Sequence, residues 1–243
     1  MSYIENPKTA GSGVIGAIPH AGLCPNGCKD CFFNRADGYL HPLSENLPNM
    51  PTPDQAEGRV VRVNDGHDSN IDREMVMEAC RPYAQKFYNT SIPRDLGGFD
   101  APVVLTVNPG AKTDKGWHRI DPIPPNLMFV RVRTNMWNLW LVDEVVDYYT
   151  ERGVSVVLTF MAYFEQPIPV EHKLNYISRT RTINRYMAIT TDAWRWVMKR
   201  YEDNVLVYSC GKIEGERGTT KCRYCGNCVR EFHSAQERLA RLV

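Results

Sequence analysis

Residues 13–31 read GVIGAIPHAGLCPNGCKDC, an apolar segment that runs directly into a loop holding Cys24, Cys28 and Cys31. Residues 13–19 predict a β-strand, because aliphatic residues are bounded there by glycine and proline. Ligands in open α/β and barrel folds bind at the carboxyl ends of strands, so the cysteine loop lies where a cofactor site is expected. A closed zinc site needs four protein ligands, and three thiolates on a four-iron cluster leave one iron open.

The rest of the chain predicts an α/β fold with a parallel sheet. Five more apolar segments are expected to be strands: residues 59–63, 102–107, 127–133, 154–161 and 205–208. Helical spacing of apolar residues predicts helices over residues 71–88, with a kink at Pro82, and over residues 138–152, 191–202 and 229–243. Alternating strands and helices imply right-handed crossovers. Residues 32–57 and 108–126 are expected to be long loops.

The C-x3-C-x2-C spacing, placed just after a predicted strand, resembles the cluster motif of the radical S-adenosylmethionine (SAM) enzymes. The six predicted strands fit the partial (β/α)6 barrel of that family. The resemblance implies a [4Fe–4S] cluster on Cys24, Cys28 and Cys31, with SAM on the open iron. It also implies reductive cleavage of SAM to a 5′-deoxyadenosyl radical, and an electron donor such as a flavodoxin or ferredoxin. The alternative is a zinc site completed by His20 or His41.

Other candidate cofactor-binding residues follow from their positions in this resemblance. The family usually has an aromatic residue just before the third cysteine; here Asp30 stands there, and Phe32 follows the motif. At the end of the second predicted strand the family binds the SAM amino group, and this chain has Asn64, Asp65 and Gly66 there. The alternative for these three is an Asx-type turn that precedes a helix.

Two arginines alternate along the fourth predicted strand and therefore share one of its faces. Arg131 and Arg133 could hold the SAM carboxylate or an acidic substrate if that face lines the barrel, and would be solvated if it does not. Asn108, at the end of the third predicted strand, and Thr159, on the fifth, are candidates for the same pocket.

A second cysteine group lies near the C-terminus. Cys210 is followed by Cys222, Cys225 and Cys228 in a C-x2-C-x2-C run, which gives four thiolates for one metal site. The arrangement resembles the auxiliary iron–sulfur clusters of many radical SAM enzymes. The run Cys222-Arg-Tyr-Cys225-Gly also resembles a zinc knuckle. Both [4Fe–4S] and zinc remain open. We therefore divide the chain into a barrel at residues 1–208 and a metal-binding extension at residues 209–243.

Bulk composition limits the remaining possibilities. The 243 residues carry a formal net charge of +1, so nucleic acid is not an expected partner despite a basic segment between Tyr176 and Arg200. The start of the chain has no apolar signal region and no apolar run is long enough to span a bilayer, which predicts a cytoplasmic protein without a membrane partner. Clustered cysteines in a reducing compartment favour metal over disulfides, and Cys80 is expected to be a buried apolar residue.

The sequence predicts an enzyme but leaves its substrate open. A small barrel with short appendages favours a peptide or protein substrate, although a small molecule also fits. No single side chain is predicted to be catalytic, because the cofactor carries the chemistry. The competing hypothesis is a non-catalytic iron–sulfur or zinc protein whose metal sites are structural or redox centres.

Overall fold

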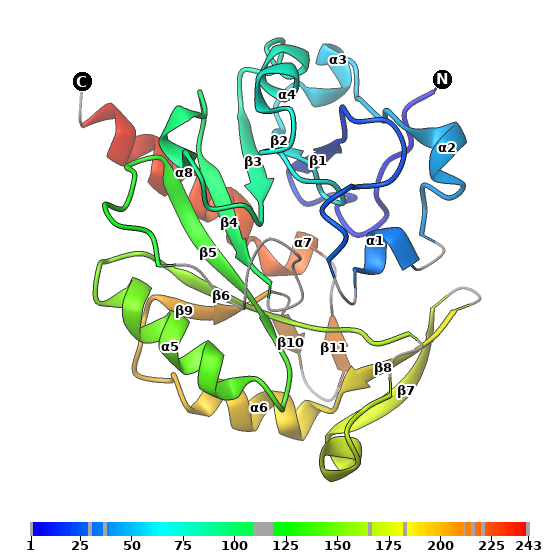
Figure 1. Ribbon diagram of the computed structural model, residues 1–243, viewed down its shortest axis with the longest axis vertical. Helices are drawn as coiled ribbons and strands as arrows, with labels where there is room; N and C mark the ends of the chain where they lie inside the picture. The colour runs from blue at the N-terminus through cyan, green and yellow to red at the C-terminus, as the bar shows by residue number, and fades with distance from the viewer. Residues whose placement is uncertain are drawn as a thin grey trace.

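The computed structural model describes residues 2–28, 31–35, 38–108, 119–164, 167–181, 184–210, 212–214, 217–219 and 222–241. Seven parallel strands form one sheet in the order β1-β2-β3-β4-β5-β6-β9 and curl through 182° into a half-barrel (Figure 1). The strands are β1 (Val14–Ala17), β2 (Val60–Val63), β3 (Lys86–Thr90), β4 (Val103–Val107), β5 (Leu127–Thr134), β6 (Val156–Phe160) and β9 (Val207–Ser209). The predicted α/β partial barrel is therefore confirmed, with one strand more than expected.

Three helices cover the outer face of the sheet. They are α4 (Arg73–Ala79), α5 (Leu139–Thr150) and α6 (Thr191–Lys199). Side chains alternate between the two faces of a strand, so Val130 and Val132 of β5 join the core beneath these helices. Arg131 and Arg133 consequently point to the opposite, inner face. The helix predicted at residues 138–152 agrees with α5, and that at residues 191–202 agrees with α6 except for its last residues.

The C-terminal helix α8 (Asn227–Ala240) packs on the inner face. Phe232 and Ala235 are buried there in a second core together with apolar residues of five strands, namely Val60, Phe87, Val104, Met128, Phe129 and Val157. The predicted amphipathic helix at residues 229–243 is confirmed, although it begins two residues earlier. Because α8 shares this core with the strands, the C-terminal extension is packed into the barrel and is not a separate layer.

The prediction of a helix over residues 71–88 is wrong in its second half. Helix α4 ends at Ala79, and residues 86–90 form β3, a central strand paired with β2 and β4. Ile71, Met75 and Ala79 have helical spacing, which correctly predicts α4. Strand β3 contains the polar residues Lys86, Asn89 and Thr90, so its sequence lacks the continuous apolar run that identifies the other strands. Cys80 is fully buried at the end of α4, as expected for a small apolar residue.

Several shorter elements occupy the connections. The first connection, expected to be a loop, contains the single-turn helices α1 (Phe32–Arg35), α2 (Leu43–Asn46) and α3 (Pro53–Ala56), and no long crossover helix. The strands β7 (Tyr176–Arg181) and β8 (Asn184–Ile189) form an antiparallel hairpin that projects from the barrel (Figure 1). The predicted basic segment is therefore divided between this hairpin and α6. Of the predicted loop at residues 108–126, residues 109–118 lie outside the described part.

Further short elements complete the chain. They are the 3₁₀ helices η1 (Leu96–Gly98) and η2 (Val170–Asn175), the small hairpin of β10 (Lys212–Glu214) and β11 (Arg217–Thr219), and the single turn α7 (Cys222–Cys225). Within the described residues, no helix combines the length and the apolar character that crossing a membrane requires.

Candidate metal and cofactor sites

The first cysteine loop lies at the carboxyl end of β1, as the sequence predicts. Cys24 is buried, and Cys28 and Cys31 are half-buried. Gly27 adopts a left-handed backbone conformation with φ of 57°, which lets the chain reverse between Cys24 and Cys28. The side-chain amide of Asn34 donates to the Cys24 carbonyl oxygen at 3.1 Å, so α1 holds the start of the loop. The loop is thus fixed to the strand and to the helix that follows it.

Two of the three thiols in this loop have raised pKa values. The pKa of Cys24 is raised to about 12, mainly by burial and to a smaller extent by the nearby charges of Asp68, Cys28 and Cys31. Burial is also the main reason why the pKa of Cys28 is raised, while Arg133 and hydrogen bonding from Asn108 oppose the shift. Thiols with raised pKa values are protonated at neutral pH, so a metal that binds there must displace protons.

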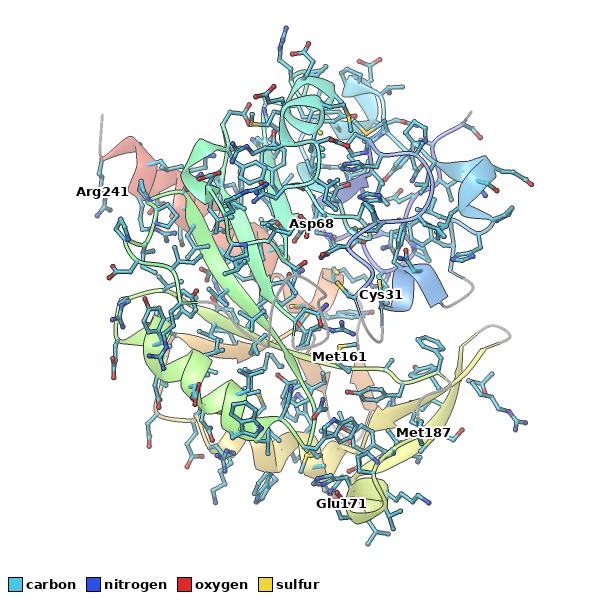
Figure 2. All side chains as sticks on the ribbon, viewed as in Figure 1. Cys31, Asp68, Met161, Glu171, Met187 and Arg241 are labelled. Atoms are coloured by element: carbon cyan, nitrogen blue, oxygen red, sulfur yellow. The ribbon has the colours of Figure 1, made fainter. Side chains whose placement is uncertain are left out.

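Two residues predicted for the cofactor pocket lie beside this loop. The Arg133 guanidinium donates through Nη1 to Asn108 Oδ1 at 2.7 Å and through Nε to Met161 Sδ at 2.8 Å. Figure 2 labels Met161 and Cys31, which are close together in that view. Arg133 pairs with Thr159 in the β5–β6 register, and the Thr159 hydroxyl is buried without a hydrogen-bond partner within the described chain. The structure therefore groups Asn108, Arg133 and Thr159 near Cys28.

The segment after β2 serves mainly to connect elements. Asn64 has φ of 58°, is 2% exposed, and uses its amide to bind Ser69 Oγ at 3.1 Å. Asp65 accepts hydrogen bonds from Arg62 at 2.5 Å and from Asn6 at 2.6 Å. Both side chains are therefore bonded within the protein, and neither is left open toward the cysteine loop; the Asx-type contact of this segment is made by Asp68, which accepts from Asn70 N at 2.9 Å.

Gly66 is the member of this segment that meets the cysteine loop. A Cβ atom added at Gly66 would lie 2.1 Å from the Phe33 ring, so the ring packs directly on the glycine backbone. Phe33 is itself 8% exposed. The side chain of Phe32, which the sequence assigns to cofactor binding, lies outside the described residues, as does Asp30.

Asp68 is an organising residue that sequence reasoning missed. Its carboxylate accepts hydrogen bonds from the backbone of Asn70 and Ser91 and from the hydroxyls of Thr90 and Ser91, at 2.6–2.9 Å. The Ser91 hydroxyl in turn accepts from Asn26 Nδ2 at 2.7 Å, and the same amide donates to Cys28 Sγ at 3.4 Å. A buried carboxylate thus links the end of β3 to the cysteine loop. Nothing in the sequence indicated this role for Asp68, because β3 itself was not predicted.

The two histidines considered as a fourth zinc ligand have other partners. His20 Nε2 contacts the Ile71 carbonyl oxygen at 2.9 Å, and its Nδ1 faces Asn64 Oδ1 at 3.4 Å. His41 Nε2 contacts the Phe33 carbonyl oxygen at 3.3 Å. His20 Nε2 is therefore committed to the Ile71 carbonyl oxygen, while Nδ1 faces Asn64.

The second cysteine group also forms one site, on the inner side of the barrel. Its four cysteines line a cavity of about 30 Å³ together with Arg62 of β2 and Arg131 of β5. Backbone hydrogen bonds fix it to the barrel, since Cys222 N donates to Lys8 O at 2.9 Å and Cys210 N donates to Leu158 O at 2.7 Å. Gly226, with φ of 69°, turns the chain between α7 and α8.

Charges around this second site are unusual. The pKa of the Cys228 thiol is raised to about 11, mainly by burial; the cations Arg62 and Arg131 oppose the rise, and Cys210 and Cys222 add to it. Arg131 was predicted to share a pocket with Arg133. Instead, the structure places Arg131 with the second cysteine group and Arg133 with the first, because the two side chains lie at successive inward positions along β5.

Within the described residues, no group of three or more His, Cys, Asp and Glu side chains has the arrangement that holds one metal ion. All eight cysteines are free thiols.

Comparisons with known proteins provide no relative from which the role of the site could be inferred. No protein-family model, curated protein or solved structure matches this chain. What the sequence and structure establish together is a parallel seven-stranded half-barrel with two cysteine groups on its inner side and at its strand ends.

Proposed function

We propose that this chain is a radical SAM enzyme, in which Cys24, Cys28 and Cys31 hold a [4Fe–4S] cluster and SAM binds the iron that lacks a protein ligand. The observation that carries the proposal is the location of the three-thiol loop. It follows β1, the first strand of a parallel half-barrel, and lies at the carboxyl end where such folds bind ligands.

The donor set supports an open cluster better than a closed zinc site. Three thiols come from one short loop, and Cys31 contributes to the raised pKa values of both Cys24 and Cys28. A closed zinc site would need a fourth protein ligand. His20 Nε2 is bonded to a backbone carbonyl and its Nδ1 faces Asn64, while His41 Nε2 faces another backbone carbonyl. Three thiolates and a vacant position suit a cluster that binds a small molecule.

The cluster and SAM together supply an electron transfer that cleaves SAM and yields a radical able to abstract hydrogen. The chain's own residues bind and orient SAM and the substrate. Arg133 is held by Asn108 and Met161 beside Cys28, which suits the recognition of a carboxylate of SAM or of an acidic substrate. Thr159 adds a buried hydroxyl that has no partner in the described chain and can bond to a ligand.

Substrate and partners follow from the same proposal. The sheet curls through only 182°, and its edge strands β1 and β9 do not pair with each other. A barrel that stays open along one side can admit a peptide or protein segment, which is the substrate class we favour over a small molecule. The proposal also requires an external one-electron donor, such as a flavodoxin or ferredoxin.

The test is anaerobic reconstitution of the full chain with iron and sulfide, followed by addition of SAM and a reductant. We expect 5′-deoxyadenosine to form, and we expect SAM to change the EPR spectrum of the reduced cluster. A variant with Cys24, Cys28 and Cys31 all replaced by alanine should lose both signals. Cys80→Ala is the matched control, because Cys80 is a buried thiol at the end of α4, in the core beneath the outer helices, and its variant should retain both signals.

Two results would overturn the proposal. One is a reconstituted protein that takes up only zinc at the first loop. The other is an iron–sulfur cluster whose EPR spectrum ignores SAM and which yields no more 5′-deoxyadenosine than the triple variant. Either result would favour the alternative, a non-catalytic metal protein.

A further inference from the structure

The hairpin of β7 and β8 is bonded to the rest of the protein along β8. The backbone of Met187 in β8 exchanges two hydrogen bonds with that of Tyr163, at 2.7 Å and 3.0 Å, so its N–H and C=O point away from β7. Met187 is the partner of Ser178 in the ladder between the two strands. Both residues of such an antiparallel pair direct their backbone groups outward. The N–H and C=O of Ser178 therefore face away from β8, as do those of Thr180, two residues further on.

The outer edge of β7 is unpaired within the described chain. Neither Ser178 nor Thr180 has a backbone hydrogen bond on this side among the residues that the structure describes. Residues 177–180 are exposed, and the register with β8 is continuous over the whole strand. The strand contains no proline and no bulge, which are the features that commonly prevent another strand from pairing with a sheet edge. An added strand can therefore bond to this edge.

The base of the hairpin is joined to the residues around the first cysteine loop. Tyr176 of β7 is 6% exposed and packs in an apolar cluster that Met161 joins. Met161 Sδ accepts a hydrogen bond from Arg133 Nε at 2.8 Å, and the charge of Arg133 acts on Cys28. A strand added to β7 therefore begins beside a cluster of side chains that reaches the first cysteine loop.

Charge decides which kind of molecule suits this edge. Residues 170–189 include one carboxylate, Glu171, against the four cations of Lys173, Arg179, Arg181 and Arg185. Pairing of β7 with the same strand of a second copy would bring like charges together, which destabilises a sheet. Nucleic acid would match the charge but offers no peptide groups to the unpaired N–H and C=O groups. An acidic polypeptide matches both.

Arg179 is the cation best placed to select such a polypeptide. It lies on β7 itself, is exposed, and forms no ion pair with a carboxylate of the described chain. Side chains alternate along a strand, so Arg179 shares its face with Ile177, which is 50% exposed. A strand beside β7 would place its own side chains next to these two residues.

From these observations we infer that the outer edge of β7 binds an extended acidic segment of the polypeptide substrate, which adds a third strand to the hairpin. Main-chain hydrogen bonds with Ser178 and Thr180 supply affinity, and Arg179 selects acidic side chains. The inference deepens the proposed function and rests on it for calling the bound segment a substrate. Binding of the segment itself requires neither a cluster nor SAM.

The experiment uses the full chain without reconstituted metal and a fluorescent peptide in which glutamate and threonine alternate. Fluorescence anisotropy measures the dissociation constant, and hydrogen–deuterium exchange of the Ser178 and Thr180 amides reports where the peptide binds. We expect slower exchange at both amides and an affinity that falls as salt is added. The same peptide with every peptide nitrogen methylated cannot donate to the edge and should bind at least about fivefold more weakly.

Variants of the protein test the edge and the charge separately. Ser178→Pro removes the outward N–H but none of the bonds between β7 and β8, because proline is tolerated where the N–H faces away from the sheet. It should bind the peptide at least about fivefold more weakly than Ser178→Ala, the matched control. Arg179→Gln should weaken binding about two- to fivefold. Arg81→Gln is its control, because Arg81 is exposed on the surface and pairs with Glu78.

The inference fails if the peptide does not bind, or if Ser178→Pro binds it as tightly as Ser178→Ala. Equal binding of a peptide with lysine in place of glutamate would overturn the preference for acidic segments. A dimer that Ser178→Pro abolishes would assign the edge to a second copy instead. If Ser178→Pro does not fold, the methylated peptide and the exchange measurement carry the test.

This outcome and that of the SAM test are separate, because the peptide is bound without a cluster. Peptide binding together with a failed SAM test would overturn the proposed chemistry and leave the docking edge. Cleavage of SAM by a protein that does not bind the peptide would overturn only the inference about β7.

Discussion

Gly66 is the position where a single atom matters most. The Phe33 ring rests on its backbone, and an added Cβ would come within 2.1 Å of Cδ2 and 2.3 Å of Cε2 of that ring. Phe33 is buried against the cysteine-loop core with Ile18 and Leu40, so it has little room to move. The contact explains a glycine here without any demand on its φ angle.

We predict that Gly66→Ala lowers the free energy of unfolding by about 1–3 kcal/mol, the usual cost of overpacking a core. Gly16→Ala is the matched control, since a Cβ at Gly16 meets nothing within 4 Å. Urea denaturation measures both variants. A loss in Gly66→Ala no larger than that in Gly16→Ala would contradict the prediction, and Phe33→Leu in the same chain should relieve the clash.

A second residue-scale feature is the stacked pair His20 and His67, whose ring centroids are 3.9 Å apart. The pKa of His67 is lowered to about 4, mainly by burial and also by the neighbouring His20. An unfolded histidine has a pKa of about 6.5. Between these values the unfolded chain binds a proton that the folded chain does not, so stability falls as the pH falls from about 6.5 to about 4.

We therefore predict that His67 costs the protein about 2 kcal/mol of stability on going from about pH 7 to about pH 5. The measurement is urea denaturation at both pH values for the wild type and His67→Asn. The variant should lose less stability on acidification, and the difference isolates His67 from other acid-sensitive groups. His233→Asn, at an exposed position of α8, should behave like the wild type. Equal acid sensitivity in all three proteins would refute the assignment.

Among the elements, α8 has the largest effect on the inner face of the barrel. Phe232 is 2% exposed and packs among apolar side chains of the strands, and Arg238 Nη2 donates to the Leu127 carbonyl oxygen at 3.0 Å. Asn227, at the start of the helix, donates to Ser209 O at 2.9 Å. The same helix begins at the second cysteine group, so its packing also sets the position of Cys228.

Phe232→Ala should lower the free energy of unfolding by about 3–5 kcal/mol, because it leaves a cavity in a closed core. It should also reduce metal uptake at the second cysteine group, because Cys228 of that group lies on the same helix. Trp196→Ala is the control, since Trp196 is an aromatic residue of α6 that is 53% exposed. Thermal unfolding and metal content measure the two effects. Full stability in Phe232→Ala would show that α8 is not part of the core.

Helices and strands were predicted correctly from the sequence where their apolar residues repeat with the period of that element. Helix α5 was predicted from Leu141, Val145 and Tyr148. Leu141 and Val145 are buried, while Tyr149 is the fully buried tyrosine and Tyr148 is only half-buried. Strand β3 was missed because a central strand with Lys86, Asn89 and Thr90 uses polar side chains that find partners only in the folded protein. Asn89, for example, donates to Val63 O at 2.9 Å and accepts from Arg131.

At the scale of the whole molecule, the half-barrel divides its interior into layers. Toward the start of the strands the inward residues are apolar and covered by α8; toward their carboxyl ends they become polar, from Arg62, Asn89 and Arg131 to Arg133 and Thr159. The second cysteine group lies beside the first polar residues, and the first group lies beside the last. Arg62 and Arg131 therefore lie at the second cysteine group, and Arg133 lies at the first.

The sequence alone determined the parallel α/β fold, the two cysteine groups and the strand end that carries the first of them. These features depend on local patterns, namely periodic apolar residues and short cysteine spacings. Only the tertiary structure decided that Arg131 and Arg133 belong to different sites, that Asp68 links β3 to the cysteine loop and that α8 fills the inner face. Those relations join residues far apart in the chain, and they arise from strand register and sheet curvature, which no local pattern encodes.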